Sequence, residues 1–238
     1  MKGSYGLELN DGSKTCKMKD SSFFCQLPPS SVKEFDAIQS TAIYPKGALL
    51  FIERQEARGI YVLCEGEVKL SISSVEGKTL ILKIARAGEL LGLMAAMAGL
   101  PYEVTAETIR PCQVAFVRRE DFLRFLAKHP EAFQGAVKQM SSQYRGACEQ
   151  LYTIGLSASA QEKLARLLLT WTEGIQQTKE GTRIKLPLTH EEIAEFIGTT
   201  RETVTRTLSD FKVRRLVAIQ GSTLMIPDRA ALESFARL

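Results

Sequence analysis

The sequence is poor in the residues and motifs on which many enzymes depend. Its 238 residues include only two histidines. One of them begins a His-Glu pair at His190, but Ala194 stands where a zinc protease helix would need its second histidine. We expect His129 and His190 to face solvent, which gives haem ligation little support. Walker loops, dinucleotide-binding glycine motifs and the Gly-x-Ser-x-Gly nucleophile motif are also missing, so we do not expect an enzyme.

Signals for membranes and secretion are missing as well. No apolar run approaches the length of a transmembrane helix, and residues 1–20 lack the apolar core of a signal peptide. The five cysteines form an odd number. This suggests a reducing compartment, in which thiols are free, metal-binding or redox-active rather than paired in structural disulfides. We therefore expect a cytoplasmic protein with no membrane association.

The composition is that of a globular protein with one large or two modest domains. Hydrophobic residues make up 45% of the chain, which is enough for buried cores, and the net charge of +4 is too small to indicate nucleic acid binding by itself. The distribution of charge is more informative. Residues 199–220 contain five basic and two acidic residues, whereas the segment before them is acidic at Glu191, Glu192 and Glu195.

The stretch from Leu188 to Phe211 has the pattern of two short helices joined by a tight turn. Thr189 and Glu192 are spaced as a capping box at the start of the first helix. Gly198 then ends that helix, because glycine tolerates the left-handed backbone required there. The pattern predicts a helix-turn-helix, whose second helix can lie in the major groove of DNA.

The second helix of this pair would bury one side and expose the other. The buried side consists of Val204, Leu208 and Phe211. An ordinary helical corner has no need of the exposed residues Arg201, Glu202 and Arg206. Arginine can bridge O6 and N7 of guanine, and glutamate can accept a hydrogen bond from N4 of cytosine. The predicted DNA-binding residues, including the caps of both helices, are Thr189, Thr199, Thr200, Arg201, Glu202, Thr205 and Arg206.

The N-terminal half has the period of β-strands. Between Thr41 and Val117, short runs alternate apolar and polar residues and are separated by glycine turns. One hairpin is expected to bury the alternating residues of its second strand, which are Leu80, Leu82 and Ile84. Many short strands with regular turns predict a sandwich or a double-sheet roll.

A long helix is expected to follow these strands, because Pro130 after His129 suits a first helical turn. Its apolar residues recur at spacings of four and three and form a seam wide enough for one partner helix. The seam residues are Phe133, Val137, Met140, Tyr144, Ala147 and Leu151. The alternative is a helix that packs only against its own roll.

Shorter elements complete the expected organisation. A helix over Ser31–Ile38 would be capped by Ser30 or Ser31, and a helix over Glu162–Trp171 would have Leu164, Leu167, Leu168 and Trp171 inward. A short strand is expected at 182–186, and strands at 216–219 and 223–226 would form a hairpin, the wing of the helix-turn-helix. The expected divisions are an arm at 1–20, a roll at 21–128, a dimerisation helix at 129–154 and a winged helix-turn-helix at 155–238.

The motif Gly198-Thr-Thr-Arg-Glu-Thr-Val-Thr-Arg206 resembles the recognition helix of the cyclic-AMP receptor protein/FNR (CRP/FNR) family, which reads roughly Gly-x-Ser/Thr-Arg-Glu-x-Val-x-Arg. The resemblance covers residues 21–230. It implies an α+β protein with an N-terminal double-stranded β-roll of the cyclic-nucleotide-binding, jelly-roll type. It further implies a long dimerisation helix, a homodimer on double-stranded DNA, and RNA polymerase as a partner.

The resemblance also points to an effector pocket in the roll, formed by Gly88, Glu89, Leu100, Pro101, Tyr144 and Cys148. In relatives that bind cyclic AMP, a Gly-Glu pair starts a short helical turn, and an Arg-Ser pair neutralises the phosphate. Here Leu100 and Pro101 replace that Arg-Ser pair, so cyclic AMP is not expected. In those relatives a threonine and a serine on the long helix contact the adenine base, and Ala147 and Cys148 stand at the matching positions here.

The oxygen-sensing branch of the family binds a 4Fe–4S cluster through a Cys-x2-Cys-x5-Cys arm and a later cysteine. Cys16 and Cys25 match the outer two cysteines of the arm, and Cys112 matches the later one. Lys19 stands in place of the middle cysteine, which leaves Asp20 as a substitute ligand. We expect that the cluster has been lost and that these cysteines are free thiols.

The sequence thus predicts a homodimeric transcription regulator controlled by an unidentified effector or redox signal. Two alternatives stay open. One is an iron–sulfur regulator of the FNR type, and the other is a constitutive DNA-binding architectural protein whose roll senses nothing.

Overall fold

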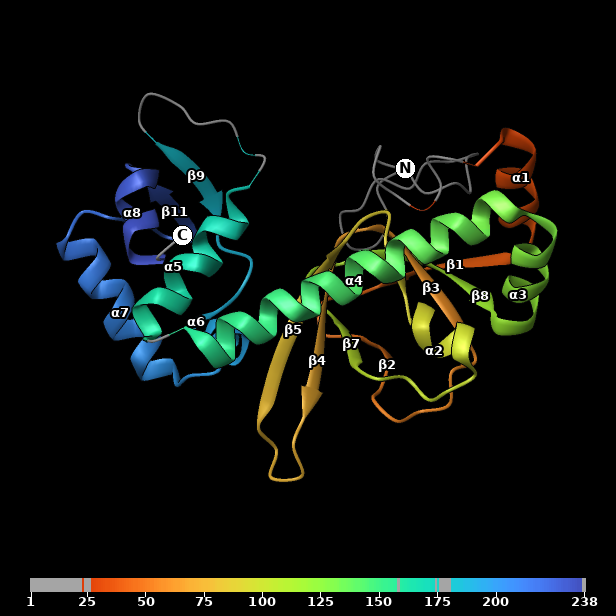
Figure 1. Ribbon diagram of the computed structural model, residues 1–238, viewed down its shortest axis with the longest axis horizontal. Coiled ribbons are helices and arrows are strands. Elements are labelled where there is room, and N and C mark those ends of the chain that lie inside the picture. The colour runs from red at the N-terminus through yellow and green to blue at the C-terminus, as the bar shows by residue number, and fades with distance from the viewer. Residues whose placement is uncertain (1–22, 24–26, 158, 174, 176–180, 237–238) are drawn as a thin grey trace. The chain divides into compact units, whose positions relative to one another are not determined.

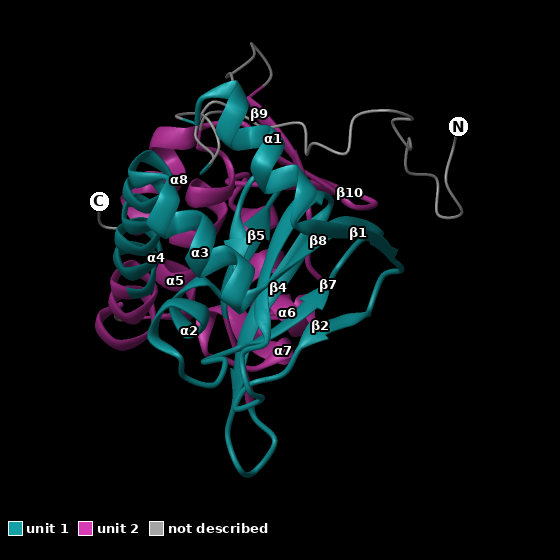
Figure 2. Ribbon diagram, turned by 90° about the vertical axis from the view of Figure 1, so that its right-hand side faces the viewer, with its two compact units in different colours: residues 1–78, 82–147 teal, residues 79–81, 148–238 magenta. Residues whose placement is uncertain are grey.

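The computed structural model describes residue 23 and residues 27–157, 159–173, 175 and 181–236. The chain divides into two compact units, which Figure 2 shows in different colours. One unit contains the residues up to 78 together with 82–147, and the other contains 79–81 and the residues from 148 onward. The predicted arm at residues 1–20 lies outside the described residues.

Two four-stranded antiparallel sheets build the roll (Figure 1). One sheet has the strand order β1-β8-β3-β6 and the other β2-β7-β4-β5. The strands are β1 Gln39–Tyr44, β2 Leu49–Phe51, β3 Gly59–Glu65, β4 Glu67–Ser73, β5 Thr79–Arg86, β6 Leu90–Leu91, β7 Thr105–Thr108 and β8 Cys112–Arg118. Side chains of both sheets meet in the core, as with Leu63 of β3 and Val68 of β4, which are fully buried. The predicted double-sheet roll is confirmed.

One detail of the predicted β4–β5 hairpin is wrong. Leu80, Leu82 and Ile84 are only half-buried, whereas the fully buried residues of β5 are Ile81 and Ala85. The apolar run of β5 offers a hydrophobic residue to either face of the sheet. Alternation alone therefore could not decide which face is covered.

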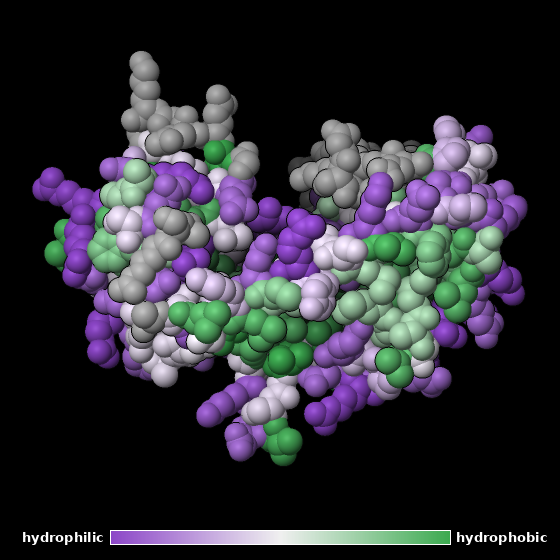
Figure 3. All heavy atoms as spheres, in the orientation of Figure 1, coloured by the Kyte–Doolittle hydropathy of each residue, from purple (hydrophilic) through white to green (hydrophobic). Residues whose placement is uncertain are grey.

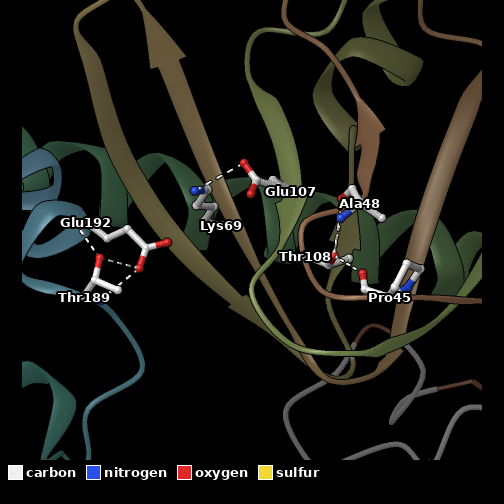
Figure 4. A network of polar contacts seen from close by, with 7 residues as sticks. All are labelled: Pro45, Ala48, Lys69, Glu107, Thr108, Thr189 and Glu192. Carbon is white, nitrogen blue, oxygen red and sulfur yellow. Dashed lines mark hydrogen bonds and ion pairs between the residues drawn. The ribbon is translucent and has the colours of Figure 1, made fainter. Parts of the chain in front are cut away.

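Polar contacts fix the loops of the roll. Thr108 at the end of β7 donates its hydroxyl hydrogen to the carbonyl of Pro45 at 2.6 Å and accepts from the amide of Ala48 at 2.9 Å (Figure 4). The ion pair of Lys69 and Glu107 joins β4 to β7 at 3.2 Å. The turn between β1 and β2 is thereby tied to the second sheet.

In the described part of the roll unit, four helices belong to it wholly or partly. They are α1 Pro29–Ala37, α2 Leu93–Ala98, α3 Arg119–Lys128 and α4 Pro130–Leu156. The predicted start of the long helix at Pro130 is confirmed. Residues of α4 up to 147 group with the roll, and those from 148 group with the C-terminal unit.

The predicted cap of α1 and the predicted exposure of His129 are both wrong, for one shared reason. Pro28 is the N-cap of α1 and makes no side-chain cap bond. Ser31 instead lies buried against His129, a residue that is only 9% exposed, with 3.0 Å between Ser31 Oγ and His129 Nδ1. The other ring nitrogen of His129 lies 3.1 Å from the Glu34 carboxylate. The contact between α1 and the residue before α4 therefore removes His129 from solvent.

Among its described residues, the C-terminal unit contains four complete helices and a three-stranded sheet. Besides the last turns of α4, these are α5 Ala160–Trp171, α6 His190–Ile197, α7 Arg201–Val213 and α8 Arg229–Ala236, with β9 Thr182–Lys185, β10 Ala218–Gln220 and β11 Thr223–Ile226. The sheet order is β10-β11-β9, so the predicted hairpin pairs with the predicted single strand. Leu164, Leu167, Leu168 and Trp171 of α5 are buried as predicted. The sequence analysis did not identify α8.

Across the residues that the structure describes, no helix is both long and apolar enough to cross a bilayer.

Candidate DNA-binding site

The first helix of the predicted motif begins where the sequence places it. Thr189 is the N-cap of α6, and its hydroxyl oxygen accepts from the amide of Glu192 at 3.2 Å. The Glu192 carboxylate accepts from the amide of Thr189 at 2.9 Å, which completes the capping box (Figure 4). Gly198 ends the helix in the left-handed conformation with φ of 64°. The predicted capping box and glycine turn are confirmed.

The second helix is held by its buried side. Val204, Leu208 and Phe211 of α7 are buried, as predicted. The ring of Phe211 packs edge-on against Phe235 of α8, with 5.6 Å between the ring centroids. The guanidinium of Arg214 lies over the ring of Phe235, 5.5 Å from its centroid. Helix α8, which the sequence analysis did not identify, therefore packs against the buried side of α7 through Phe235.

The opposite side of α7 is polar and open. Arg201, Glu202, Thr205 and Arg206 are all exposed, while Thr200 caps the helix by accepting from the amide of Thr203 at 3.3 Å. The pKa of Glu202 is lowered, first by a hydrogen bond from its own backbone amide and then by the Thr200 hydroxyl, with a further contribution from Arg201. At neutral pH the helix therefore presents a carboxylate between two guanidinium groups.

The remaining predicted residues flank the two helices of the motif. Thr189 and Thr200 are exposed at the starts of α6 and α7, and Thr199 between them is half-buried. Two features were not predicted. His190 of α6 is only half-buried, not fully exposed, and its Nδ1 lies 3.0 Å from Oγ1 of Thr205 on α7. A side-chain contact between two helices leaves no periodic signal in the sequence.

The predicted effector residues have a different environment from that of a nucleotide-binding turn. Gly88 and Glu89 do not start a helix, because they form the turn before β6, and α2 begins only after Gly92. The Glu89 carboxylate pairs with Lys83 and accepts from the amide of Arg86 at 3.0 Å. It is therefore engaged within its own turn.

The remaining predicted effector residues lie open to solvent. Leu100 is 60% exposed, and Pro101, Tyr144 and Cys148 are also exposed. An apolar pair at Leu100 and Pro101 offers no cation to a phosphate. These positions therefore do not supply the phosphate contact that a cyclic nucleotide requires.

The cysteines were predicted to be unpaired. Cys16, Cys25 and Asp20 lie outside the described residues. Cys64 on β3 is disulfide-bonded, so the expectation that structural disulfides are absent is wrong for this residue. Cys112 and Cys148 are free.

Cys112 is a closely packed thiol in this structure. Its thiol is fully buried, and its single hydrogen is shared between the carbonyl oxygens of Arg110 and Glu67, which lie 3.2 Å and 3.4 Å from the sulfur. Burial raises the pKa of this thiol to about 11, so it is protonated at neutral pH. A Cβ on Gly66 would come within 2.5 Å of the Cys112 sulfur, so the sulfur is closely packed on that side.

The predicted seam of α4 is largely open in the single chain. Phe133, Val137, Tyr144 and Leu151 are 48%, 43%, 71% and 68% exposed, and Ala147 is exposed too. Met140 differs, because it packs partly against the core of the roll. The adjacent side of the same helix holds Ala132 and Ala136, which are fully buried in that core. Figure 3 shows apolar residues gathered over α4 and the neighbouring roll.

Comparisons with known proteins agree with this architecture. Residues 42–129 match the family model of the cyclic nucleotide-binding domain, and residues 162–235 match that of the Crp-like helix-turn-helix domain. The transcriptional activatory protein AadR of Rhodopseudomonas palustris is 27% identical over 222 residues, which cover 93% of this chain and 91% of AadR. A CRP-like cAMP-activated global transcriptional regulator of Mycobacterium tuberculosis is 24% identical, over 90% of this chain and 96% of that protein.

Solved structures show the same fold. FixK2 from Bradyrhizobium japonicum aligns with a TM-score of 0.74 at 21% identity, covering 83% of this chain and 97% of that one. A CooA mutant from Carboxydothermus hydrogenoformans aligns with a TM-score of 0.75 at 21% identity, covering 93% and 98%.

Fold, motif and matches together define a DNA-binding transcription regulator that joins a sensing roll to a winged helix-turn-helix. The chain belongs to the CRP/FNR family.

Proposed function

We propose that this chain is a cytoplasmic homodimer that recognises a two-fold symmetric DNA site and acts on transcription through RNA polymerase. Arg201, Glu202 and Arg206 would read base edges in the major groove, with Thr205 beside them, while Thr189, Thr199 and Thr200 would face the phosphate backbone. One observation carries the proposal. The exposed row of α7 is charged and hydrogen-bond-capable, whereas its other side is fixed by the buried Val204, Leu208 and Phe211.

The proposed dimer rests on the exposed seam of α4. Val137, Tyr144 and Leu151 follow one another at intervals of seven residues and are all exposed. A strip with this period suits a second helix in a two-stranded coiled coil. Two recognition helices would then meet two half-sites about one turn of DNA apart.

The roll is proposed to control the dimer through α4. The side chain of Gln139 on α4 accepts from the amide of Leu90 at 3.3 Å and donates to its carbonyl at 2.8 Å. Gln143 donates to the same carbonyl at 3.2 Å. A movement of the Gly88–Glu89 turn would therefore reach the dimer helix directly and shift the balance between binding-competent and incompetent dimers. Cyclic AMP is not proposed as the effector, because Leu100 and Pro101 provide no phosphate contact.

Two substitutions at Arg206 test base reading. Arg206→Lys keeps the charge but loses the two-pronged donor that matches guanine, and Arg206→Ala loses both. Each should cost about 1–3 kcal/mol on a site obtained by selection from random DNA. Only Arg206→Ala should also weaken binding to unrelated DNA. If both variants lost specific and non-specific affinity equally, Arg206 would be a phosphate contact and the assignment would be wrong.

A further inference from the structure

His190 and Thr205 connect the two helices of the motif on its exposed side. His190 is the first residue of α6, and its Nδ1 lies 3.0 Å from Oγ1 of Thr205, which is in the second turn of α7. In the sequence, Thr205 lies between Arg201 and Arg206, two of the residues proposed to read bases. A residue of the first helix therefore contacts the row of side chains that faces DNA.

The direction of this hydrogen bond follows from counting hydrogens. The Thr205 hydroxyl has one hydrogen, and it donates that hydrogen to the carbonyl oxygen of Arg201 at 3.0 Å. Oγ1 of Thr205 must then accept from His190, so Nδ1 of His190 carries a hydrogen. Such a donor exists both in the neutral tautomer with hydrogen on Nδ1 and in the imidazolium.

These two bonds fix the side chain of Thr205 in one rotamer. Its hydroxyl donates to the helix backbone and accepts from the imidazole, so it has no hydrogen to donate to a base and only one lone pair left, while its methyl group is available for apolar contact. A threonine methyl makes apolar contact with the C5-methyl group of thymine. A threonine with a free hydroxyl could instead accept from or donate to several bases.

We propose that His190 is a positioning residue for base recognition, which holds Thr205 so that its methyl group selects thymine at one position of each half-site. This inference rests on the proposed function, because it requires the exposed row of α7 to face base edges. It assigns a role in specificity to a residue of the first helix.

The packing of the motif does not depend on the His190–Thr205 bond. The start of α6 is already closed by the bonds between Thr189 and Glu192, and α6 is held by its buried Ile193, Ala194 and Ile197. Loss of the His190 side chain should therefore change what Thr205 presents without unfolding the unit.

Three variants test the proposal by selection of operator sequences and by measurement of affinity for each base at the affected position. His190→Ala removes the donor to Thr205. His190→Asn retains one, because the amide nitrogen of asparagine lies close to the place of Nδ1. Thr205→Val replaces the hydroxyl with a second methyl group of similar size.

His190→Ala should reduce the preference for thymine roughly three- to tenfold, the range expected for one hydrogen bond. His190→Asn should restore it. Thr205→Val should keep the preference for thymine, and adding His190→Ala to it should have no further effect, since the acceptor is gone. Circular dichroism and affinity for unrelated DNA show whether each variant is folded.

Other outcomes overturn the proposal. His190→Ala with an unchanged base preference would show that His190 positions nothing. An equal loss of affinity for all four bases, not restored by asparagine, would make His190 a backbone contact. The Arg206→Lys result separates the two levels. If Arg206→Lys relaxes specificity and His190→Ala does not, only this inference fails. If neither does, the proposed base-reading face itself is wrong.

Discussion

The amide of Thr189 donates to the carboxylate of Glu192 at 2.9 Å, and the amide of Glu192 donates back to the hydroxyl of Thr189 at 3.2 Å. Two amides at the start of α6 are satisfied within the protein, before any DNA is bound. The N-terminus of α6, the helix that precedes the recognition helix, is thereby stabilised by its own capping box.

The first prediction concerns this cap. Thr189→Ala should lower the free energy of unfolding of the C-terminal unit by about 1 kcal/mol, the usual cost of losing such a cap. Thr189→Ser retains the oxygen and should recover most of that loss. Chemical denaturation followed by Trp171 fluorescence measures both variants. Equal stability of the alanine and serine variants would show that the cap contributes nothing.

Local signals explain why the helix-turn-helix could be predicted well. The Thr189–Glu192 spacing, Gly198 and the apolar residues of α7 act within a few residues of one another, and the structure confirms each of them. Their meaning depends little on the rest of the fold. The wing strands were found for a similar reason, since Gly221 marks the turn between them with φ of 60°.

Long-range contacts explain what could not be predicted. The burial of His129 depends on Ser31, which lies 98 residues earlier in the chain. The role of α8 depends on the contact of Phe235 with Phe211, and its eight residues alone give only a short amphipathic pattern. The bond of His190 to Thr205 spans two helices. Each of these needs the tertiary structure to become visible.

The second prediction concerns pH and the contact between α1 and the end of α3. The pKa of Glu34 is lowered from its ordinary value of 4.5, first by a hydrogen bond from Lys128 and then by one from His129. A carboxyl group with a lowered pKa in the folded state contributes stability above its unfolded pKa and loses it as the pH falls through the folded value.

Glu34→Gln should therefore be less stable than the parent protein at pH 6–7, and the difference should shrink as the pH falls below about 4.5. Urea denaturation across this pH range measures the effect. Glu76→Gln, at an exposed position of the β4–β5 turn, is the matched control. A difference for Glu34→Gln that stayed constant with pH would show that ionisation of Glu34 does not contribute.

The third prediction concerns the thiol of Cys112. Burial raises its pKa to about 11, and the thiolate is the reactive form. At pH 8 the folded protein should therefore leave Cys112 almost unmodified by iodoacetamide, while denaturant should make it react readily. The exposed Cys148 serves as the internal comparison. Peptide mapping by mass spectrometry identifies the modified residue, and rapid alkylation of Cys112 in the folded protein would contradict the assignment.

The last prediction concerns assembly. Val137 is 43% exposed in the middle of the seam on α4, and Tyr144 and Leu151 continue the same strip. Val137→Glu would place two carboxylates in the interface of a homodimer, where neither has a partner, so dissociation is the expected result. Val75→Glu is the matched control, since Val75 is 99% exposed at the tip of the β4–β5 turn. Sedimentation velocity should show Val137→Glu as a monomer and Val75→Glu as a dimer. Because one recognition helix alone reads only a half-site, the monomer should also lose specific binding. A Val137→Glu protein that sedimented as a dimer would move the interface away from α4.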